Sequence, residues 1–441
     1  MRRLAESLIV IPLALLSWSP ALAQAPAAAA GGGAQVVVTP PPEGAPMGGP
    51  SPPPAPEGAP PPAEPVAAPP AETAAPKNPP AGWVKGAGFV IQSEDAKYRL
   101  RIGLQAAYKF EPVYQNGEFI NRNTFFVLRP SISGNFLEDW IHFWTSFEFA
   151  SNPPYLLDSY VEATPCKEFG IRVGQMWTPF DRHEYLGPQE ILFPEWAPVS
   201  EYFWSGRDKG VLLLGTLANQ LEWWAGVYSG TPLRQFNALP GNYVLQGRLT
   251  WSPLGLIASN EFPYITEENG APFKVSMTLQ WYYGKLQQAT ENFNPSTFRF
   301  ETMATGEKHK ENTGGADIWL QGRMFAFFAE AMVRKVTPEG VPSYTSVGAW
   351  GQAGVPLIRR TMDIAARFNW LNPSTSLAND QFYSIEGQLA WYVSHSQNLV
   401  IKLRYGLGHQ DSPGMAALGD VPLVLPAGRT QLGTIQLNLA F

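Results

Sequence analysis

Residues 98–110, YRLRIGLQAAYKF, alternate between apolar and polar side chains with a period of two. One face of an extended chain would carry Tyr98, Leu100, Ile102, Leu104, Ala106, Tyr108 and Phe110, and the other Arg99, Arg101, Gln105 and Lys109. Because successive side chains of a β-strand point to opposite faces, this pattern predicts a strand with one apolar face and one polar face. Such a strand would exceed the roughly five or six residues that are usual in globular proteins.

The same alternation recurs after residue 86, for example in residues 141–149, 273–284, 383–393 and 399–408. Repeated segments of about ten residues with this pattern are typical of strands that cross an outer membrane. Aromatic residues about ten positions apart, such as Tyr98 and Tyr108, would then lie at the two bilayer interfaces. A soluble β-sandwich is the alternative, and the strand lengths and the aromatic spacing argue against it. No apolar run of about eighteen residues follows the N-terminal segment, which excludes helical membrane spans.

The pattern therefore predicts an all-β protein, a 16-stranded antiparallel transmembrane β-barrel. We expect strand centres near residues 104, 130, 146, 159, 173, 213, 225, 248, 278, 318, 330, 350, 366, 389, 404 and 435. An even number of strands lets both termini lie on the periplasmic side. We expect inner turns at residues 137–140, 165–168, 218–220 and 394–397, and outer loops at residues 181–208, 285–313 and 410–429. The connection at residues 253–272 is too long for a tidy inner turn, and the sequence does not explain it.

The two ends of the chain support export and barrel closure. Arg2 and Arg3, an apolar run at residues 8–16 and small residues at 21–23 predict a signal peptide over residues 1–23, with cleavage after Ala25 as the alternative. Residues 24–85, rich in Pro, Ala and Gly, predict a disordered periplasmic linker before a barrel at residues 86–441. The last strand ends on Phe441 and must pair with the first, because open strand edges cannot exist in hydrocarbon.

Composition and motifs exclude several classes of function. The net charge of -6 gives nucleic acid no electrostatic attraction, and the single cysteine, Cys166, cannot form an internal disulfide. The five histidines are scattered, and the chain contains no HExxH, GxSxG, Walker or paired-cysteine motif. We therefore expect neither an enzyme nor a bound metal or cofactor.

Three stretches resemble the phosphate-selective porin O/P family: LLDSYVEA (residues 156–163), IRVGQMWTPF (residues 171–180) and SGRDKGVLLLG (residues 205–215). The resemblance extends over residues 98–441. It implies trimeric, sixteen-stranded channels whose third outer loop folds inward and narrows the pore, a role that falls to residues 181–208. It also implies that Phe441 forms part of the signal read by the barrel-assembly machinery. Where the family has an Arg-rich second strand, the stretch FFVLRPSISGNF (residues 125–136) of this chain keeps only Arg129.

The candidate site is the charged interior of the barrel. The strand phases predict that the pore-lining cations are Arg99, Arg101, Lys109, Arg129, Arg172, Arg248, Lys274, Arg367, Lys402 and Arg404. The constriction loop would carry Asp181, Arg182, Glu184, Glu190, Glu195, Glu201, Arg207 and Asp208. A basic wall that faces an acidic loop would set a transverse field across the pore. The alternative is that many of these charges pair with one another and tune nothing.

These observations predict a porin in the outer membrane of a Gram-negative bacterium. It would form a weakly selective, water-filled channel for passive diffusion of small polar solutes and ions. Its expected partners are outer-membrane lipid, two further copies of the chain in a homotrimer, and the assembly machinery. Two alternatives remain open: a tethering protein that acts through its Pro/Ala-rich arm, and a substrate-specific channel for anions such as phosphate.

Overall fold

The computed structural model describes residues 81–84, 88–95, 97–115, 118–136, 140–151, 153–230, 241–257, 260–268, 270–287, 289–294, 299–304, 308–393, 395–411, 415–418, 421–424 and 428–441. The predicted signal peptide and residues 24–80 of the predicted linker lie outside the described residues. None of the helices found in the described part of the chain has the length and apolar character that a membrane crossing requires.

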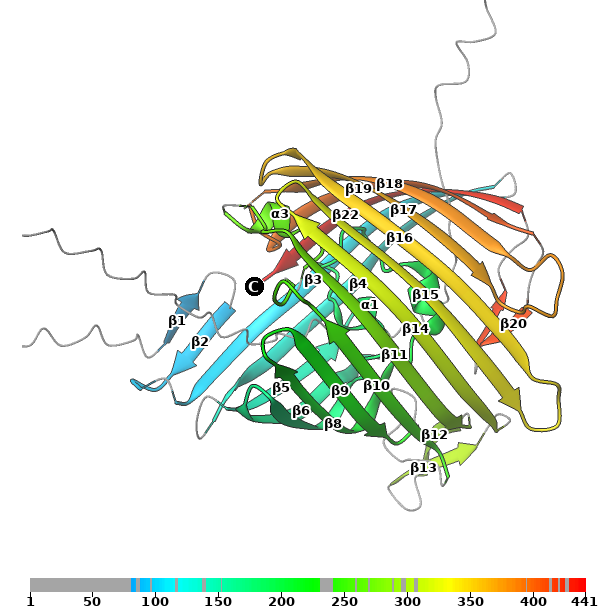
Figure 1. The fold of residues 1–441 in the computed structure, drawn as a ribbon, viewed down its shortest axis with the longest axis horizontal. Coiled ribbons are helices and arrows are strands. Elements are labelled where there is room, and N and C mark those ends of the chain that lie inside the picture. The colour runs from blue at the N-terminus through cyan, green and yellow to red at the C-terminus, as the bar shows by residue number, and fades with distance from the viewer. Residues whose placement is uncertain are drawn as a thin grey trace, which may run out of the picture.

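Sixteen long strands, counted over the described residues, form a closed antiparallel barrel (Figure 1). They are β3 (Arg99–Gln115), β4 (Glu118–Asn135), β5 (Ile141–Glu148), β6 (Tyr155–Cys166), β7 (Phe169–Trp177), β8 (Arg207–Leu217), β9 (Leu221–Tyr228), β10 (Tyr243–Trp251), β11 (Lys274–Leu286), β14 (His309–Gly322), β15 (Phe325–Pro338), β16 (Tyr344–Ile358), β17 (Met362–Asn372), β18 (Phe382–Tyr392), β19 (Leu399–Gln410) and β22 (Gly428–Ala440). Each predicted strand centre falls within one of them, so the predicted barrel is confirmed.

The last strand closes the barrel against the first, as the sequence predicts. In β22, Leu437 lies opposite Tyr108 of β3, and the backbone of Phe441 exchanges hydrogen bonds with Leu104. Beyond that point β2 (Gly88–Gln92) pairs with β3, and β1 (Ala81–Val84) pairs with β2. A Cβ on Gly88, whose φ is +77°, would lie 2.3 Å from the Ile102 carbonyl oxygen, so only glycine fits where β2 begins beside the C-terminus. β2 therefore pairs with the part of β3 that lies beyond the end of β22, and β1 pairs with β2.

Burial along the strands is the reverse of that in a soluble protein. On β18, Ile385 is 59% exposed, whereas its neighbour Glu386 is 2% exposed. The outward face of the barrel is apolar and its inward face carries buried polar side chains. This arrangement suits a cylinder whose outer solvent is lipid.

Two long connections fold into the barrel and occupy part of its interior. The first joins β7 to β8 and contains α1 (Arg182–Tyr185) and α2 (Pro198–Phe203). The second joins β10 to β11 and contains α3 (Pro263–Thr266), which lies near the end that holds the C-terminus (Figure 1). We call them the outer insert (residues 178–206) and the inner insert (residues 252–273). The inner insert is the connection whose length the sequence left unexplained.

The inserts pack on each other and on the wall to form an apolar core inside the barrel. Leu192 and Phe193 of the outer insert cluster with Phe262, Tyr264 and Ile265 of the inner insert. The same cluster includes small or aromatic inward residues from β15, β17, β18 and β19. Smaller hairpins, β12 (Ala289–Asn294) with β13 (Arg299–Ala304) and β20 (Met415–Leu418) with β21 (Val421–Val424), lie in the predicted outer loops.

Candidate functional site: the charged barrel interior

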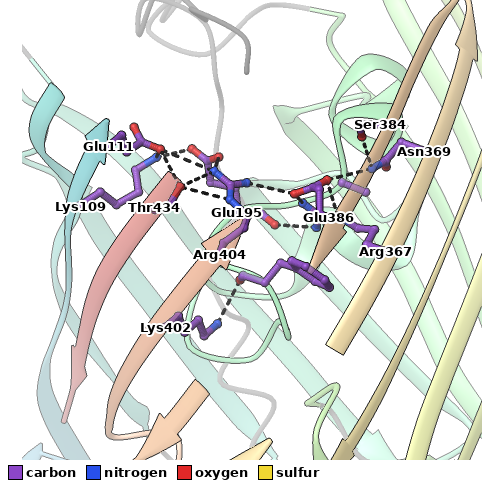
Figure 2. Close-up of polar contacts among 12 residues, drawn as sticks. Lys109, Glu111, Glu195, Arg367, Asn369, Ser384, Glu386, Lys402, Arg404 and Thr434 are labelled. Carbon is purple, nitrogen blue, oxygen red and sulfur yellow. Dashed lines mark hydrogen bonds and ion pairs between the residues drawn. The ribbon is translucent and has the colours of Figure 1, made fainter. Parts of the chain in front are cut away.

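Glu195 of the outer insert anchors that segment to the barrel wall at the seam (Figure 2). Its carboxylate accepts hydrogen bonds from Lys109 on β3 and from Nη2 of Arg404 on β19, the latter at 2.8 Å. Glu111, next to Lys109 on the same face of β3, lies 3.6 Å from Arg404. One loop carboxylate thus joins two strands that flank β22.

A second carboxylate, Glu386 on β18, extends this network along the wall (Figure 2). Arg367 on β17 donates to it through Nε at 3.0 Å and Nη2 at 2.8 Å, and Arg404 donates at 3.3 Å. The remaining nitrogen of Arg367 donates to the backbone carbonyl of Glu195 at 2.9 Å. Because every charge in the network has a partner of opposite sign, the network holds the outer insert without leaving free charge in the interior.

Lys402 on β19 holds a turn of the outer insert through backbone atoms alone. Its ammonium donates to the carbonyl oxygens of Pro188 at 3.2 Å, Ile191 at 2.5 Å and Phe193 at 3.0 Å. The side chain is completely buried. Three carbonyl oxygens match the three donors of an ammonium group, so this lysine replaces its hydration shell with the loop backbone.

The carboxyls of the outer insert differ in their ionisation. Burial raises the pKa of Asp181, which caps α1, and raises the pKa of Glu184 well above its ordinary value. Burial also raises the pKa of Glu190 to about 7, and burial and the nearby Glu195 charge raise that of Glu201 to about 8. Burial opposes ionisation of Glu195 too, but Lys109 and Arg404 hold its pKa below the ordinary value.

These pKa values predict that the outer insert is held less firmly in alkaline solution. A carboxyl with a raised pKa in the folded insert keeps a proton that the released insert would lose above pH 4.5. Packing of the insert therefore weakens as pH rises from about 4.5 to about 8, by at most about 1.4 kcal/mol per pH unit for each group. Channel current recorded between pH 5 and pH 9 should become noisier and larger at the alkaline end. The Glu190→Gln/Glu201→Gln variant should show a flatter pH dependence; an unchanged slope would contradict this account.

All ten predicted cations lie on inward-facing positions, but most have a structural partner. Three pair with acids on other strands: Arg129 with Glu148 and Arg172 with Glu162 on adjacent strands, and Arg248 on β10 with Asp317 on β14, across β11. Lys109, Arg367, Lys402 and Arg404 bind the outer insert, and Lys274 donates to the Leu256 carbonyl of the inner insert. Arg99 and Arg101 are half-buried, and they are the two of the ten for which the described residues show neither an acidic partner nor a contact with an insert. The alternative that many charges pair with each other therefore describes six of the ten, and two more, Lys402 and Lys274, bond backbone carbonyls of the inserts.

The predicted loop residues divide between the outer insert and the strand that follows it. Arg182 lies on α1, with its guanidinium 3.3 Å from the centre of the Trp319 ring. Arg207 and Asp208 are the first residues of β8 rather than loop residues, because they pair with Trp177 and Met176 of β7. The Arg207 side chain bonds Asp158 on β6, and Asp208 accepts a hydrogen bond from Ser229. The described residues contain no group of three or more His, Cys, Asp or Glu side chains that could hold a metal ion.

Sequence reasoning missed two of the acids that complete these contacts, Glu111 and Glu261. Glu111 lies on β3, but its position in the sequence does not indicate that its partner is Arg404 of β19. Glu261 of the inner insert bonds the outer insert, and the only signal for it was the excessive length of the 253–272 connection. Neither contact follows from strand alternation, because both join segments far apart in the chain.

Residues 97–441 match the model of a family described as phosphate-selective porin O and P. The chain belongs to this family. The family and the closed barrel together identify the porin as a channel of the Gram-negative outer membrane. No curated protein matches the porin by sequence.

Solved porins share the fold at low sequence identity. OmpT of Vibrio cholerae superposes with a TM-score of 0.52 at 8% identity, covering 80% of this chain and 100% of that one. An anion-selective porin from Comamonas acidovorans gives a TM-score of 0.52 at 10% identity, covering 78% and 99%. A trimer form of the Vibrio cholerae OmpT gives 0.51 at 8% identity, covering 78% and 99%. At these identities the likeness concerns the barrel and not its solutes.

Proposed function

We propose that the porin is a passive, weakly anion-preferring channel for small polar solutes and ions. The observation that carries this proposal is the division of the inward cations. Eight are bonded to acids or to the inserts, whereas Arg99 and Arg101 are half-buried on β3 without an acidic partner among the described residues. Raised pKa values also reduce the negative charge of the outer insert, so two arginines are not offset by an acidic loop.

Planar-bilayer recording of the full chain tests the channel itself. We expect ohmic current and a reversal potential in a KCl gradient that reports a modest preference for chloride. Folded protein that inserts without opening a conductance would overturn the proposal. It would also favour the alternative of a tether that acts through residues 24–80, which lie outside the described residues.

The Arg99→Ala/Arg101→Ala variant should lose most of the anion preference. Removing two cations that have no acidic partner in the described part of the chain lowers the positive potential along the water path, so the reversal potential should move toward zero while conductance stays within about twofold. The control is Lys167→Ala/Arg323→Ala, which removes the same charge from exposed turns between strands. A preference unchanged in the β3 variant, or lost equally in the control, would show that other groups set selectivity.

The family match favours phosphate as one of the permeating anions. If the interior holds a specific phosphate site, added phosphate should block chloride current with a saturable concentration dependence. A purely passive channel should instead show current that changes in proportion to phosphate concentration. This titration separates the passive channel from the substrate-specific alternative.

Assembly and export complete the proposed function. We propose a homotrimer, which conductance steps in groups of three would report, and a cleaved signal peptide over residues 1–23. The trimer form of the Vibrio cholerae outer membrane protein OmpT, which has the same fold, supports the proposed homotrimer. Phe441, whose backbone bonds Leu104 of β3, would be read by the assembly machinery before the barrel closes.

A further inference from the structure

Four lysines gather on the outward surface of the barrel at the end opposite the C-terminus (Figure 1). Lys285 is the penultimate residue of β11, Lys308 precedes β14 directly, Lys310 is the second residue of β14, and Lys335 lies near the end of β15. Lys310 pairs directly across the strands with Lys285, and Lys335 lies opposite Asn312, two residues further along β14. We call these four residues the outer lysine cluster.

The cluster faces the surroundings of the barrel and not its interior. Lys310 and Lys335 are exposed and alternate with inward-facing buried residues such as Glu311 and Arg334. Exposed Trp281 shares the outward face of β11 with Lys285, and exposed Val333 shares that of β15 with Lys335. β11, β14 and β15 lie side by side in the barrel, so their outward positions form one continuous surface (Figure 1).

An aromatic band lies directly below the cluster. The ring centres of Tyr243 and Tyr283 are 6.0 Å apart, and those of Trp281 and Tyr283 are 6.4 Å apart with nearly parallel planes. Aromatic rings on the outside of a membrane barrel occupy the level of the lipid headgroups. Lys285, two residues beyond Tyr283, therefore lies about 7 Å further out, where lipid phosphate groups would be.

The cluster also contains a repulsion that a bound anion would relieve. Like charges placed directly opposite each other destabilise a strand pair, and Lys285 and Lys310 occupy such a position. A cavity of about 130 Å³ opens beside them, lined by Lys285, Lys308, His309, Lys310, Thr337, Pro338 and Glu339. Among the described residues that line the cavity, the three lysines face a single acid, Glu339.

We propose that the outer lysine cluster binds phosphate groups of an outer-leaflet lipid whose acyl chains lie against the aromatic band. Each ammonium is a strong donor to phosphate oxygens, and exposed apolar side chains such as Trp281, Leu279 and Val333 lie below the cluster. The site lies outside the water path, so this inference goes beyond the proposed channel function and does not depend on selectivity. Free inorganic phosphate shares the chemistry of the headgroup, but it would gain nothing from the aromatic band.

Native mass spectrometry of the full chain in detergent can test the proposal with diphosphorylated lipid A, monophosphorylated lipid A and inorganic phosphate as probes. We expect binding in that order, with affinity that decreases as salt rises. The Lys285→Gln/Lys310→Gln variant should bind diphosphorylated lipid A about tenfold more weakly than the wild type. The Lys167→Gln/Arg323→Gln variant, which removes equal charge elsewhere, should bind it with unchanged affinity. Heat modifiability on gels establishes that each variant is folded, and conductance should be unchanged in both.

Three outcomes would overturn the proposal. The double lysine variant could bind diphosphorylated lipid A as tightly as the wild type, or the control could weaken equally. Inorganic phosphate could bind as tightly as the lipid, which would assign the cluster to free phosphate. If the double variant does not fold, Lys285→Gln and Lys335→Gln are tested singly, and each should lower the affinity for diphosphorylated lipid A. Unchanged affinity in both single variants would rule out the site.

Discussion

Arg404→Ala is expected to release the outer insert and to enlarge the channel. Arg404 on β19 bonds Glu195 of the insert at 2.8 Å and Glu386 of β18 at 3.3 Å, and it lies 3.6 Å from Glu111. Removing it leaves buried carboxylates that have lost a cation, a change that costs about 3–5 kcal/mol when one partner of a buried pair is deleted. The release of the insert restores hydration to Glu195, so we expect the insert to leave the wall.

The measurements are single-channel conductance and the temperature at which the folded gel band converts to the unfolded one. We expect a larger, noisier conductance and a lower conversion temperature for Arg404→Ala. The conductance and conversion temperature of Arg404→Lys should lie between those of Arg404→Ala and the wild type. Lysine keeps the charge, but it lacks the planar guanidinium group that bonds two carboxylates at once. Arg323→Ala, at an exposed turn, is the control. Wild-type conductance and conversion temperature in Arg404→Ala would show that the network does not hold the insert.

Strand alternation predicted the barrel because lipid outside and polar groups inside impose a period of two on every strand. The alternation on β19 therefore places Arg404 on the inner face without any knowledge of its partners. It cannot name Glu195 as the partner, because that residue is 209 positions away and lies on a loop without a repeating pattern. The alternation also predicted the turn at residues 218–220, because it lies between two alternating segments. Ala218 and Asn219 both have positive φ there, although alanine is not a typical residue for that conformation.

The interior charges were harder to interpret from the sequence than the barrel. A face assignment says that Lys402 points inward, but three backbone carbonyls of the outer insert make it a structural anchor. Acidic residues in the insert predicted a negative loop, whereas burial keeps several of those carboxyls protonated far above their ordinary range. Both differences arise from tertiary burial, which depends on how the inserts pack and not on local sequence.

Glu261→Gln is expected to loosen the outer insert from the opposite side, through the inner insert. The Glu261 carboxylate lies between three donors: His183 Nε2 at 2.8 Å, the Leu192 backbone N–H at 2.7 Å, and the Gln352 amide at 2.6 Å. Burial acts to raise its pKa, but the contacts with His183, Leu192 and Gln352 hold the pKa below the ordinary value. The site is thus built for an acceptor with two ionised oxygens.

The tautomer of His183 determines which hydrogen bond the Glu261→Gln substitution removes. His183 Nδ1 accepts a hydrogen bond from the Ala197 N–H at 3.1 Å, so its proton is on Nε2 and is donated to Glu261. A glutamine has one accepting oxygen, and its NH₂ group would face another donor. One buried donor is then left unsatisfied, at a cost of about 1–3 kcal/mol, and the two inserts separate where they meet.

Hydrogen exchange of residues 187–197 and single-channel conductance measure that separation. Glu261→Gln should expose the Leu192 amide to exchange and raise conductance, whereas Glu267→Gln, a half-buried glutamate of the same insert, should change neither. His183→Gln removes the partner from the outer insert, so the double variant should add little beyond either single one. Strictly additive effects, or full protection of residues 187–197 in Glu261→Gln, would show that the inner insert fills space without positioning the outer one.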